Sequence, residues 1–141
     1  MKNIDARVLA LNNNLIFLVL EKEKEVIIPG KESFTKHSLW GMPGGRGEDE
    51  DGDEIDTVIR EVKEEIGLSA YINEQFRVEW QEKDYVRVGF IGELAKGTIR
   101  INPEEILDGK WFPRGILYDE RFPIYLGHRQ MAQELLRKLG K

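Results

Sequence analysis

The sequence predicts an α/β fold, in which helices pack on a β-sheet. Strand-like apolar stretches recur along the chain, and two segments, residues 53–66 and 126–139, carry apolar residues at helical spacing. Strands interspersed with two helices favour a sheet that the helices cover. The 141 residues are the usual size of one compact domain, so we predict a single domain over residues 1–141.

The first predicted element is a β-hairpin near the N-terminus. Residues 7–11 and 15–20 are apolar runs that flank three asparagines at 12–14. Asparagine tolerates the left-handed backbone of tight turns, which favours a hairpin here. The second run is apolar on both faces, so we place it in the interior of a covered sheet. Residues 21–38 are mostly polar and predict a loop, with a short strand at 26–28.

Three further strands and a final helix are predicted in the second half of the chain. The strands cover residues 70–80, residues 84–94 and the neighbourhood of 110–112. The helix fits residues 126–139. Its apolar positions are Leu126, Met131, Leu135, Leu136 and Leu139.

The most regular helical pattern covers residues 53–66 and stops at Gly67, a residue type that commonly ends helices. At about 100° per residue, one face of this helix is apolar, and we expect it to pack on the sheet. That face consists of Ile55, Val58, Ile59, Val62 and Ile66.

An adjacent stripe of this helix carries Glu61, Glu64 and Glu65. Side chains three and four residues apart meet on a helix, so these carboxylates repel one another unless a cation compensates them. Mg²⁺ prefers oxygen ligands and often bridges carboxylates to phosphates. Arg60 is expected to pair with Glu64. A merely solvated acidic face is the alternative, but the preceding Pro-Gly-Gly favours a site, because glycines let the backbone approach ions and phosphates closely.

Met42-Pro43-Gly44-Gly45, the acidic loop after it and residues 60–68 together resemble the Nudix box. The second half of that motif, Arg-Glu-U-x-Glu-Glu-x-Gly-U with U apolar, matches at every defined position. The resemblance implies the family's fold, an α/β/α sandwich with a mixed β-sheet. The motif helix would cover one face of the sheet and the C-terminal helix the other.

The loop between the two halves of the motif departs from the family pattern. Counting from the second glycine places Asp51 at the first glutamate, whereas counting back from the arginine places Gly52 there. The loop therefore carries one additional residue. The first glutamate is either absent or replaced by Asp51, Glu50 or Asp53. The acidic run at 48–51 is expected to be solvated, with an additional metal site as the alternative.

The resemblance implies a metal site and a hydrolytic reaction. Glu61 and Glu65 would be ligands of Mg²⁺, for which Mn²⁺ can substitute, and Glu64 would be a further ligand or a water-mediated contact. Arg60 would orient Glu64. A metal-activated water would attack the phosphorus after a carboxylate takes its proton, so no covalent nucleophile is needed.

Glu105 is the candidate for a further catalytic carboxylate, because family members often take one from a later loop, and Glu104 is its alternative. Ordinary capping of a short helical turn is the competing interpretation of this Pro-Glu-Glu segment. The candidate substrate-binding residues are Gly44, Gly45, Arg7 and Tyr85.

The substrate that the resemblance implies is a small nucleotide, either a nucleoside diphosphate linked to another moiety or a nucleoside triphosphate. Tyr85 weakly favours dinucleoside polyphosphates, and the absence of proline between Pro43 and Pro103 disfavours ADP-ribose. A non-catalytic Nudix-like nucleotide sensor and an RNA-end hydrolase are the alternatives. All three glutamates of the stripe are present, which favours an enzyme. A homodimer would be consistent with the family.

Composition excludes several other classes. The chain has no cysteine, which excludes a disulfide framework, a thiolate zinc site and a cysteine nucleophile. The net charge of −5 opposes binding to nucleic-acid polymers and membranes. The N-terminal residues show no signal-peptide pattern and the longest apolar run is too short to span a bilayer, so a cytoplasmic location is expected.

Several conspicuous residues have ordinary structural interpretations. His37 and His128 lack a second histidine at ligand spacing, so surface or packing positions are expected rather than zinc binding. Arg87, like Arg7, lies on a predicted strand, where either solvation or a phosphate contact fits. The tryptophans lie in strand-like segments, where core packing is commoner than stacking on a nucleobase. They are Trp40, Trp80 and Trp111.

Overall fold

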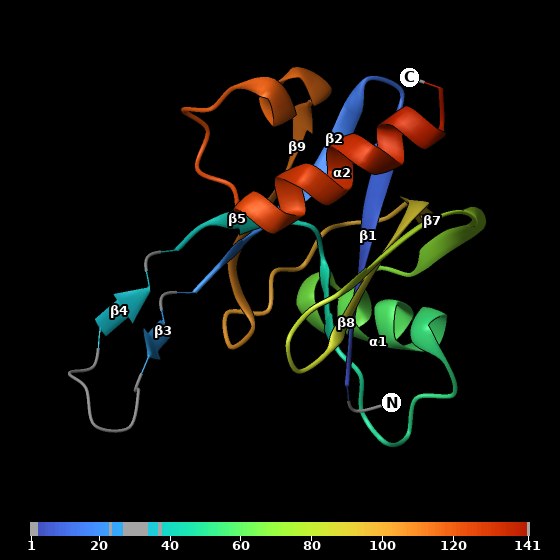
Figure 1. Ribbon diagram of the computed structural model, residues 1–141, viewed down its shortest axis with the longest axis vertical. Helices are drawn as coiled ribbons and strands as arrows, with labels where there is room; N and C mark the ends of the chain where they lie inside the picture. The colour runs from blue at the N-terminus through green and yellow to red at the C-terminus, as the bar shows by residue number, and fades with distance from the viewer. Residues whose placement is uncertain (1–2, 23, 27–33, 37, 141) are drawn as a thin grey trace.

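A seven-stranded mixed sheet forms the centre of the computed structural model, which describes residues 3–22, 24–26, 34–36 and 38–140 (Figure 1). The main path of the sheet is β5-β2-β1-β8-β7, while β6 pairs with β1 and β9 with β2. β1 and β8 are parallel, and the other pairs in this sheet are antiparallel. The strands are β1 (Ile4–Asn12), β2 (Leu15–Glu21), β5 (Trp40–Gly41), β6 (Gly44–Arg46), β7 (Ala70–Gln81), β8 (Val86–Leu94) and β9 (Ile106–Pro113).

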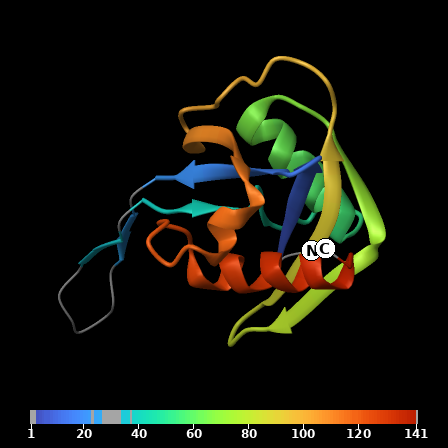
Figure 2. The ribbon, with the colours of Figure 1, turned by 90° about the horizontal axis from the view of Figure 1, so that it is seen from above.

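Two helices cover opposite faces of this sheet. α1 (Glu54–Ile66) contacts β1, β6 and β7, and α2 (Leu126–Lys138) packs on β7 and β8 from the other side. Figure 2 shows the strands lying between green α1 and red α2. The predicted α/β/α sandwich with a mixed sheet is confirmed.

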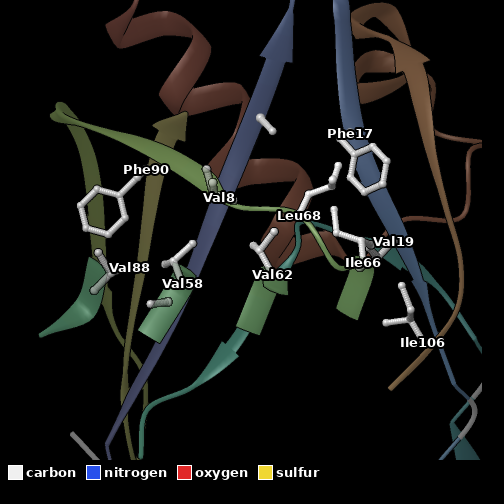
Figure 3. Close-up of a cluster of buried hydrophobic side chains, with 13 residues drawn as sticks. Val8, Phe17, Val19, Val58, Val62, Ile66, Leu68, Val88, Phe90 and Ile106 are labelled. Atoms are coloured by element: carbon white, nitrogen blue, oxygen red, sulfur yellow. The ribbon is translucent and has the colours of Figure 1, made fainter. Parts of the chain in front are cut away.

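Successive side chains of the central strands point to opposite faces of the sheet, so the core consists of two layers, one on each face. Val8 of β1 faces the α1 layer and Leu9 faces the α2 layer, while Phe17 and Leu18 of β2 divide in the same way. All four side chains are fully buried, which explains why the run at 15–20 has no polar face. Figure 3 shows the α1 layer, in which the helix contributes Val58, Val62 and Ile66.

The hairpin between β1 and β2 forms where the sequence predicts it. Asn12 pairs with Leu15, so the turn contains only Asn13 and Asn14. Asn13 has a φ of 56°, in the left-handed region that asparagine tolerates. The short turn holds two apolar strands in register, and each of them supplies side chains to both core layers.

Both ends of α1 follow from local chemistry. Asp53 is the N-cap, and its side chain accepts a hydrogen bond of 2.9 Å from the N–H of Asp56. Gly67 ends the helix with a φ of 76°, and its N–H donates to the carbonyl of Lys63. The predicted range of 53–66 therefore holds, apart from the cap residue.

Two apolar helix residues that were predicted to lie in the core are exposed, so these two predictions are wrong. Ile59 is 36% exposed, because it lies about 100° around the helix from Val58 and beyond the edge of the buried face. Leu126 is 67% exposed, because it is the first residue of α2 and precedes the turn that packs on the sheet. The remaining apolar positions of both helices are buried or partly buried against the core.

Three further strands and a short 3-10 helix follow α1 in the chain. The predicted strands at 70–80 and 84–94 are confirmed as β7 and β8, whereas β9 extends further than 110–112 because it pairs with β2 along the whole length of β2. A 3-10 helix, η1 (Arg114–Tyr118), follows β9. No helix among the described residues is long and apolar enough to cross a membrane.

A separate two-stranded sheet occupies part of the segment predicted as a loop. It consists of β3 (Lys24–Val26) and β4 (Phe34–Lys36). The predicted strand at 26–28 overlaps β3 at its first residue only, and residues 27 and 28 lie outside the described residues. The same holds for His37.

Candidate active site

The two glycines of the motif place a strand directly against the acidic helix. β6 pairs with β1, and the N–H of Gly44 donates a 3.0 Å hydrogen bond to Oε1 of Glu65. Gly44 has a φ of 137°, and a Cβ here would lie 2.1 Å from the carbonyl oxygen of Ala6. A side chain at this position would therefore push the strand away from both β1 and the carboxylate.

Gly45 brings the backbone equally close to a second carboxylate. A Cβ on Gly45 would lie 2.7 Å from the carboxyl carbon of Glu61. The absence of a side chain therefore leaves room for Glu61 between α1 and β6. The two glycines and the two glutamates form one contact surface, as the motif predicted.

Arg60 is the centre of an ionic network on the solvent side of this surface. Its Nη1 donates to Glu64 at 3.1 Å, which confirms the predicted pair, and to Glu61 at 3.2 Å. Its Nη2 donates to the backbone carbonyl of Arg46 at 3.0 Å. One arginine thus ties α1 to β6 and fixes the position of Glu61.

Asp51 is the residue of the lengthened loop that contacts Arg60 where the motif would have its first glutamate. Its carboxylate accepts hydrogen bonds from Arg60 at 2.9 and 3.1 Å and from the hydroxyl of Thr57 at 2.9 Å. Hydrogen bonds from Arg60, which outweigh the effect of burial, hold the pKa of Asp51 well below its usual range. Of the three candidates, Asp53 caps the helix and Glu50 is exposed.

A cavity of about 220 Å³ opens beside the two glycines, and we name it the carboxylate cavity. Glu61, Glu65 and Glu105 come together there, from α1 and from the loop before β9. Glu64 does not line this cavity, and Glu104 does not either. The other lining residues are Arg7, Glu21, Lys22, Gly44, Gly45 and Arg46.

Backbone hydrogen bonds connect the loop that carries Glu105 to the end of α1. The N–H of Asn102 donates to the carbonyl of Glu65 at 2.9 Å, and the N–H of Glu105 donates to the carbonyl of Asn102. The side chain of Asn102 accepts from the N–H of Glu104 at 3.1 Å, which caps the turn. The segment is thus a capped turn that also directs one glutamate to the cavity.

Burial changes the acidity of the two glutamates at the glycines. It raises the pKa of Glu65 to about 8, against the lowering effect of Arg7. It also raises the pKa of Glu61 to about 7, although the neighbouring Arg60 lowers it. Two buried carboxylates with this environment are stabilised in the charged form by a cation.

A divalent cation fits this donor set. Among the residues that the structure describes, no three histidine, aspartate or glutamate side chains converge at the distances of a closed metal cage. Mg²⁺ is usually held by one or two carboxylates together with water and substrate phosphates. Glu61 and Glu65 supply two such carboxylates, and the cavity beside them leaves room for the remaining ligands. The acidic run at 48–51, of which residues 48–50 are exposed, likewise forms no group of three such side chains within the described residues.

Arg7, which was predicted to contact a phosphate, uses most of its hydrogen-bond donors for partners within the protein. Arg7 is 9% exposed and donates to Asp5 at 2.7 Å, to Glu21 at 2.9 Å and to the carbonyl of Met42 at 3.1 Å. Its side chain forms a wall of the cavity. Glu21 was missed by the sequence analysis, because it lies at the end of a strand and belongs to no motif.

The residues that were interpreted as structural are packed as expected. His128 is 4% exposed, and its Nδ1 accepts a 2.9 Å hydrogen bond from the N–H of Met42. Trp40 packs edge-on against Phe112, and Trp111 against Phe17. Trp80 packs against the α2 layer of the core.

The fold and the site together define an α/β/α domain whose acidic helix lies under a glycine-containing strand. The family model of the NUDIX domain matches residues 6–135. The chain belongs to the Nudix hydrolase family.

Two characterised relatives are similar over part of the chain. The NAD-capped RNA hydrolase NudC of Mannheimia succiniciproducens is 35% identical over 81 residues, which cover 57% of this chain and 29% of NudC. The 8-oxo-dGDP phosphatase NUDT18 of Homo sapiens is 30% identical over 112 residues, which cover 74% of this chain and 34% of NUDT18. The chain thus spans about a third of the length of these relatives.

Solved structures share the fold. An ADP-ribose pyrophosphatase from Streptococcus suis has a TM-score of 0.67 at 23% identity, covering 100% of this chain and 94% of its own. The NUDIX domain of Shewanella oneidensis NrtR, in complex with ADP ribose, has a TM-score of 0.68 at 22% identity, covering 96% of this chain and 86% of its own. At this identity the likeness concerns the fold alone.

Proposed function

We propose that the protein hydrolyses a phosphoanhydride bond in a nucleoside diphosphate linked to another moiety, or in a nucleoside triphosphate, and that it requires Mg²⁺. The observation that carries this proposal is the contact between the Gly44–Gly45 backbone and two carboxylates, the buried one of Glu65 and the partly buried one of Glu61. A cation bound there would lie next to a backbone that a phosphate can approach closely.

The names of the similar proteins support the substrate class. NAD-capped RNA, 8-oxo-dGDP and ADP-ribose each contain a nucleoside diphosphate unit, and they are named in two relatives and two structural neighbours. These molecules differ in whether a further group is attached to the diphosphate and in what that group is. The nucleoside diphosphate is therefore the common feature that we carry over to this chain.

Each residue of the site has a proposed role. Glu61 and Glu65 would hold the cation, for which Mn²⁺ can substitute, and Gly44 and Gly45 would leave room for the diphosphate. When bound, the cation neutralises phosphate oxygens and makes an attacking water more acidic. Glu105 lines the same cavity from the opposite loop and is the candidate to take the proton of that water.

Arg60 and Glu64 would act by holding Glu61 in position. Arg60 donates to both Glu61 and Glu64, so it would hold Glu61 in the orientation that the cation needs. Glu64 lies outside the cavity lining and would complete this network, or contact the cation through water. An arginine fixed by Asp51 is a rigid support for such a site.

The proposal is tested by incubating the purified protein with Mg²⁺ and a nucleotide panel, and separating the products by chromatography. The panel contains ADP-ribose, NADH, dinucleoside polyphosphates, nucleotide sugars and normal and oxidised triphosphates. We expect cleavage of at least one nucleotide, abolished by EDTA and restored by Mg²⁺ or Mn²⁺. Mg²⁺-dependent binding of a nucleotide without any product would instead support a non-catalytic sensor domain.

A further inference from the structure

A second cavity, of about 330 Å³, adjoins the carboxylate cavity, and we name it the arginine cavity. The two cavities share Arg7, Glu21 and Arg46 as lining residues. A ligand held at the carboxylates can therefore extend into the arginine cavity. Its far wall is formed by Tyr85 and Arg87, and by the first residues of α2.

The charges that line the arginine cavity do not balance. Three guanidinium groups face two carboxylates, those of Asp5 and Glu21. Arg7 uses both carboxylates, at 2.7 and 2.9 Å. The first turn of α2 contributes no acidic residue. Arg87 is therefore left with one long contact to Asp5, at 3.9 Å. Arg46 also lines the carboxylate cavity with Glu61, Glu65 and Glu105, but it forms no ion pair with them among the described residues.

Arg87 has unused hydrogen-bonding capacity inside the protein. Its Nη2 donates to the Tyr85 hydroxyl at 2.8 Å, and its only ion pair among the described residues is a long one, 3.9 Å from Nε to Asp5. That Nε atom is buried and has no hydrogen-bond partner in the described structure. A Cβ on Gly127 would lie 2.4 Å from Nη1, so this glycine makes room for the guanidinium at the start of α2.

Arg46 lies at the junction of the two cavities. Its guanidinium carbon stacks 3.9 Å from the centre of the Tyr85 ring, and Arg87 lies 5.7 Å from the same ring. Within the described ranges, the side chain of Arg46 forms no ion pair, although its backbone carbonyl accepts from Arg60. Tyr85 thus holds two arginines near one another without neutralising them.

We propose that Arg46 and Arg87 bind a phosphate group of the substrate other than the two joined by the bond that is cleaved. Guanidinium groups with free donors form strong, charge-assisted hydrogen bonds to phosphate. The preferred substrates would then be nucleotides with a third phosphate, either in line in a polyphosphate chain or attached to a ribose. This inference rests on the proposed function and deepens it.

Two matched substrate pairs distinguish the sources of that phosphate. Diadenosine diphosphate and diadenosine tetraphosphate differ in the length of the polyphosphate chain, and NADH and NADPH differ by one phosphate on a ribose. The kcat/KM of each is measured for the wild type, Arg46→Gln, Arg87→Gln and Arg87→Lys. Arg121→Gln is the matched control, because Arg121 is exposed and pairs only with its neighbour Asp119.

We expect the wild type to prefer the more phosphorylated member of at least one pair. Arg46→Gln and Arg87→Gln should each reduce that preference about 10- to 100-fold, mainly through KM, as the loss of a charge-assisted hydrogen bond predicts. Arg87→Lys should retain part of it, and Arg121→Gln all of it. Unchanged preference in both glutamine variants, with unchanged melting temperatures, would overturn the inference while leaving the hydrolytic function intact.

The inference is also testable if no nucleotide is cleaved, an outcome that would count against the proposed function instead. Titration calorimetry then compares inorganic tripolyphosphate with pyrophosphate, both in the presence of Mg²⁺. Tighter binding of tripolyphosphate to the wild type, lost in Arg46→Gln and Arg87→Gln, would support the arginine cavity as a phosphate site. Equal binding by the wild type and both variants would overturn it.

Discussion

Arg60 holds the carboxylate of Asp51 with two hydrogen bonds, from Nε at 2.9 Å and from Nη2 at 3.1 Å. The loop before α1 carries one residue more than the motif allows, and an aspartate is one methylene shorter than the glutamate of the motif. The longer loop brings the shorter side chain to the arginine. The same arginine contacts Glu61 and Glu64, so this bond connects the altered loop to the proposed metal site.

Asp51→Asn should destabilise the protein at neutral pH and less so at pH 3. The pKa of Asp51 is lower in the folded protein than its ordinary value of 3.8, so the contribution of its ionised form to stability is fully present above about pH 4. This contribution decreases progressively as the pH falls below about 4, towards the lowered pKa of the folded protein. We expect the free energy of unfolding at pH 7 to fall by about 1–3 kcal/mol, measured by urea denaturation.

Asp84→Asn is the control, because Asp84 is exposed and forms no ion pair with any other described residue. Its unfolding curve should match the wild type at both pH 7 and pH 3. The interpretation of Asp51 fails if Asp51→Asn is as stable as the control at pH 7, or if its deficit is the same at both pH values.

Gly44→Ala and Gly45→Ala should have different effects. A Cβ on Gly44 meets the backbone of β1 and requires a positive φ, so we expect unfolding to become easier by about 1–3 kcal/mol or more. The three atoms nearest to a Cβ on Gly45 all belong to the carboxylate of Glu61, the end of a side chain, which can move away at the cost of its hydrogen bond with Arg60. Gly45→Ala should therefore keep the melting temperature and lose activity, at least about 10-fold. Equal loss of stability in both variants would contradict this distinction.

Ile66→Ala and Ile59→Ala compare two isoleucines of the same helix. Ile66 is fully buried beneath the sheet, and its truncation should cost about 2–5 kcal/mol in thermal or chemical unfolding. Ile59 is 36% exposed, so its truncation should cost less than about 1 kcal/mol. Similar losses for both residues would mean that Ile59 is buried, as the helical pattern alone predicts.

These isoleucines also show what the sequence could predict. The pattern of apolar residues predicted the two helices and the five longer strands β1, β2, β7, β8 and β9, because side chains buried on one face recur at regular intervals. The edge of that face is less defined, and Ile59 and Leu126 both fall outside it. Strand β9 is longer than predicted because its pairing with β2 includes Asp108 and Gly109, which do not form a strand-like pattern. The short strands β4, β5 and β6 were not predicted.

The site was predictable where a motif fixes the spacing and less so elsewhere. Glu61, Glu65 and the glycines line one cavity, and Glu105, which the family resemblance suggested as a later-loop carboxylate, lines it as well. Arg46 reaches the site because β6 packs against α1, and Glu21 reaches it because β2 pairs with β1. No local sequence pattern predicts these contacts. The arginine cavity likewise depends on α2 closing over β8, far away in the sequence.

Glu105→Gln should lower kcat with a small effect on KM. If Glu105 takes the proton of the attacking water, its loss should slow turnover about 100-fold or more. Glu104→Gln is the matched control, since Glu104 is adjacent in the same turn but does not line the cavity. Equal activity in the two variants would exclude Glu105 as the base and direct attention to Glu64.

The most direct test of the central claim is the kcat of Glu65→Gln, measured at saturating Mg²⁺ with the best nucleotide of the panel. Glu50→Gln is the control, because Glu50 belongs to the exposed acidic loop. We predict a loss of at least about 100-fold for Glu65→Gln, with its fold retained and its Mn²⁺ binding weakened, and no change for Glu50→Gln. Full activity in Glu65→Gln, or a comparable loss in Glu50→Gln, would contradict a catalytic metal site between α1 and the two glycines.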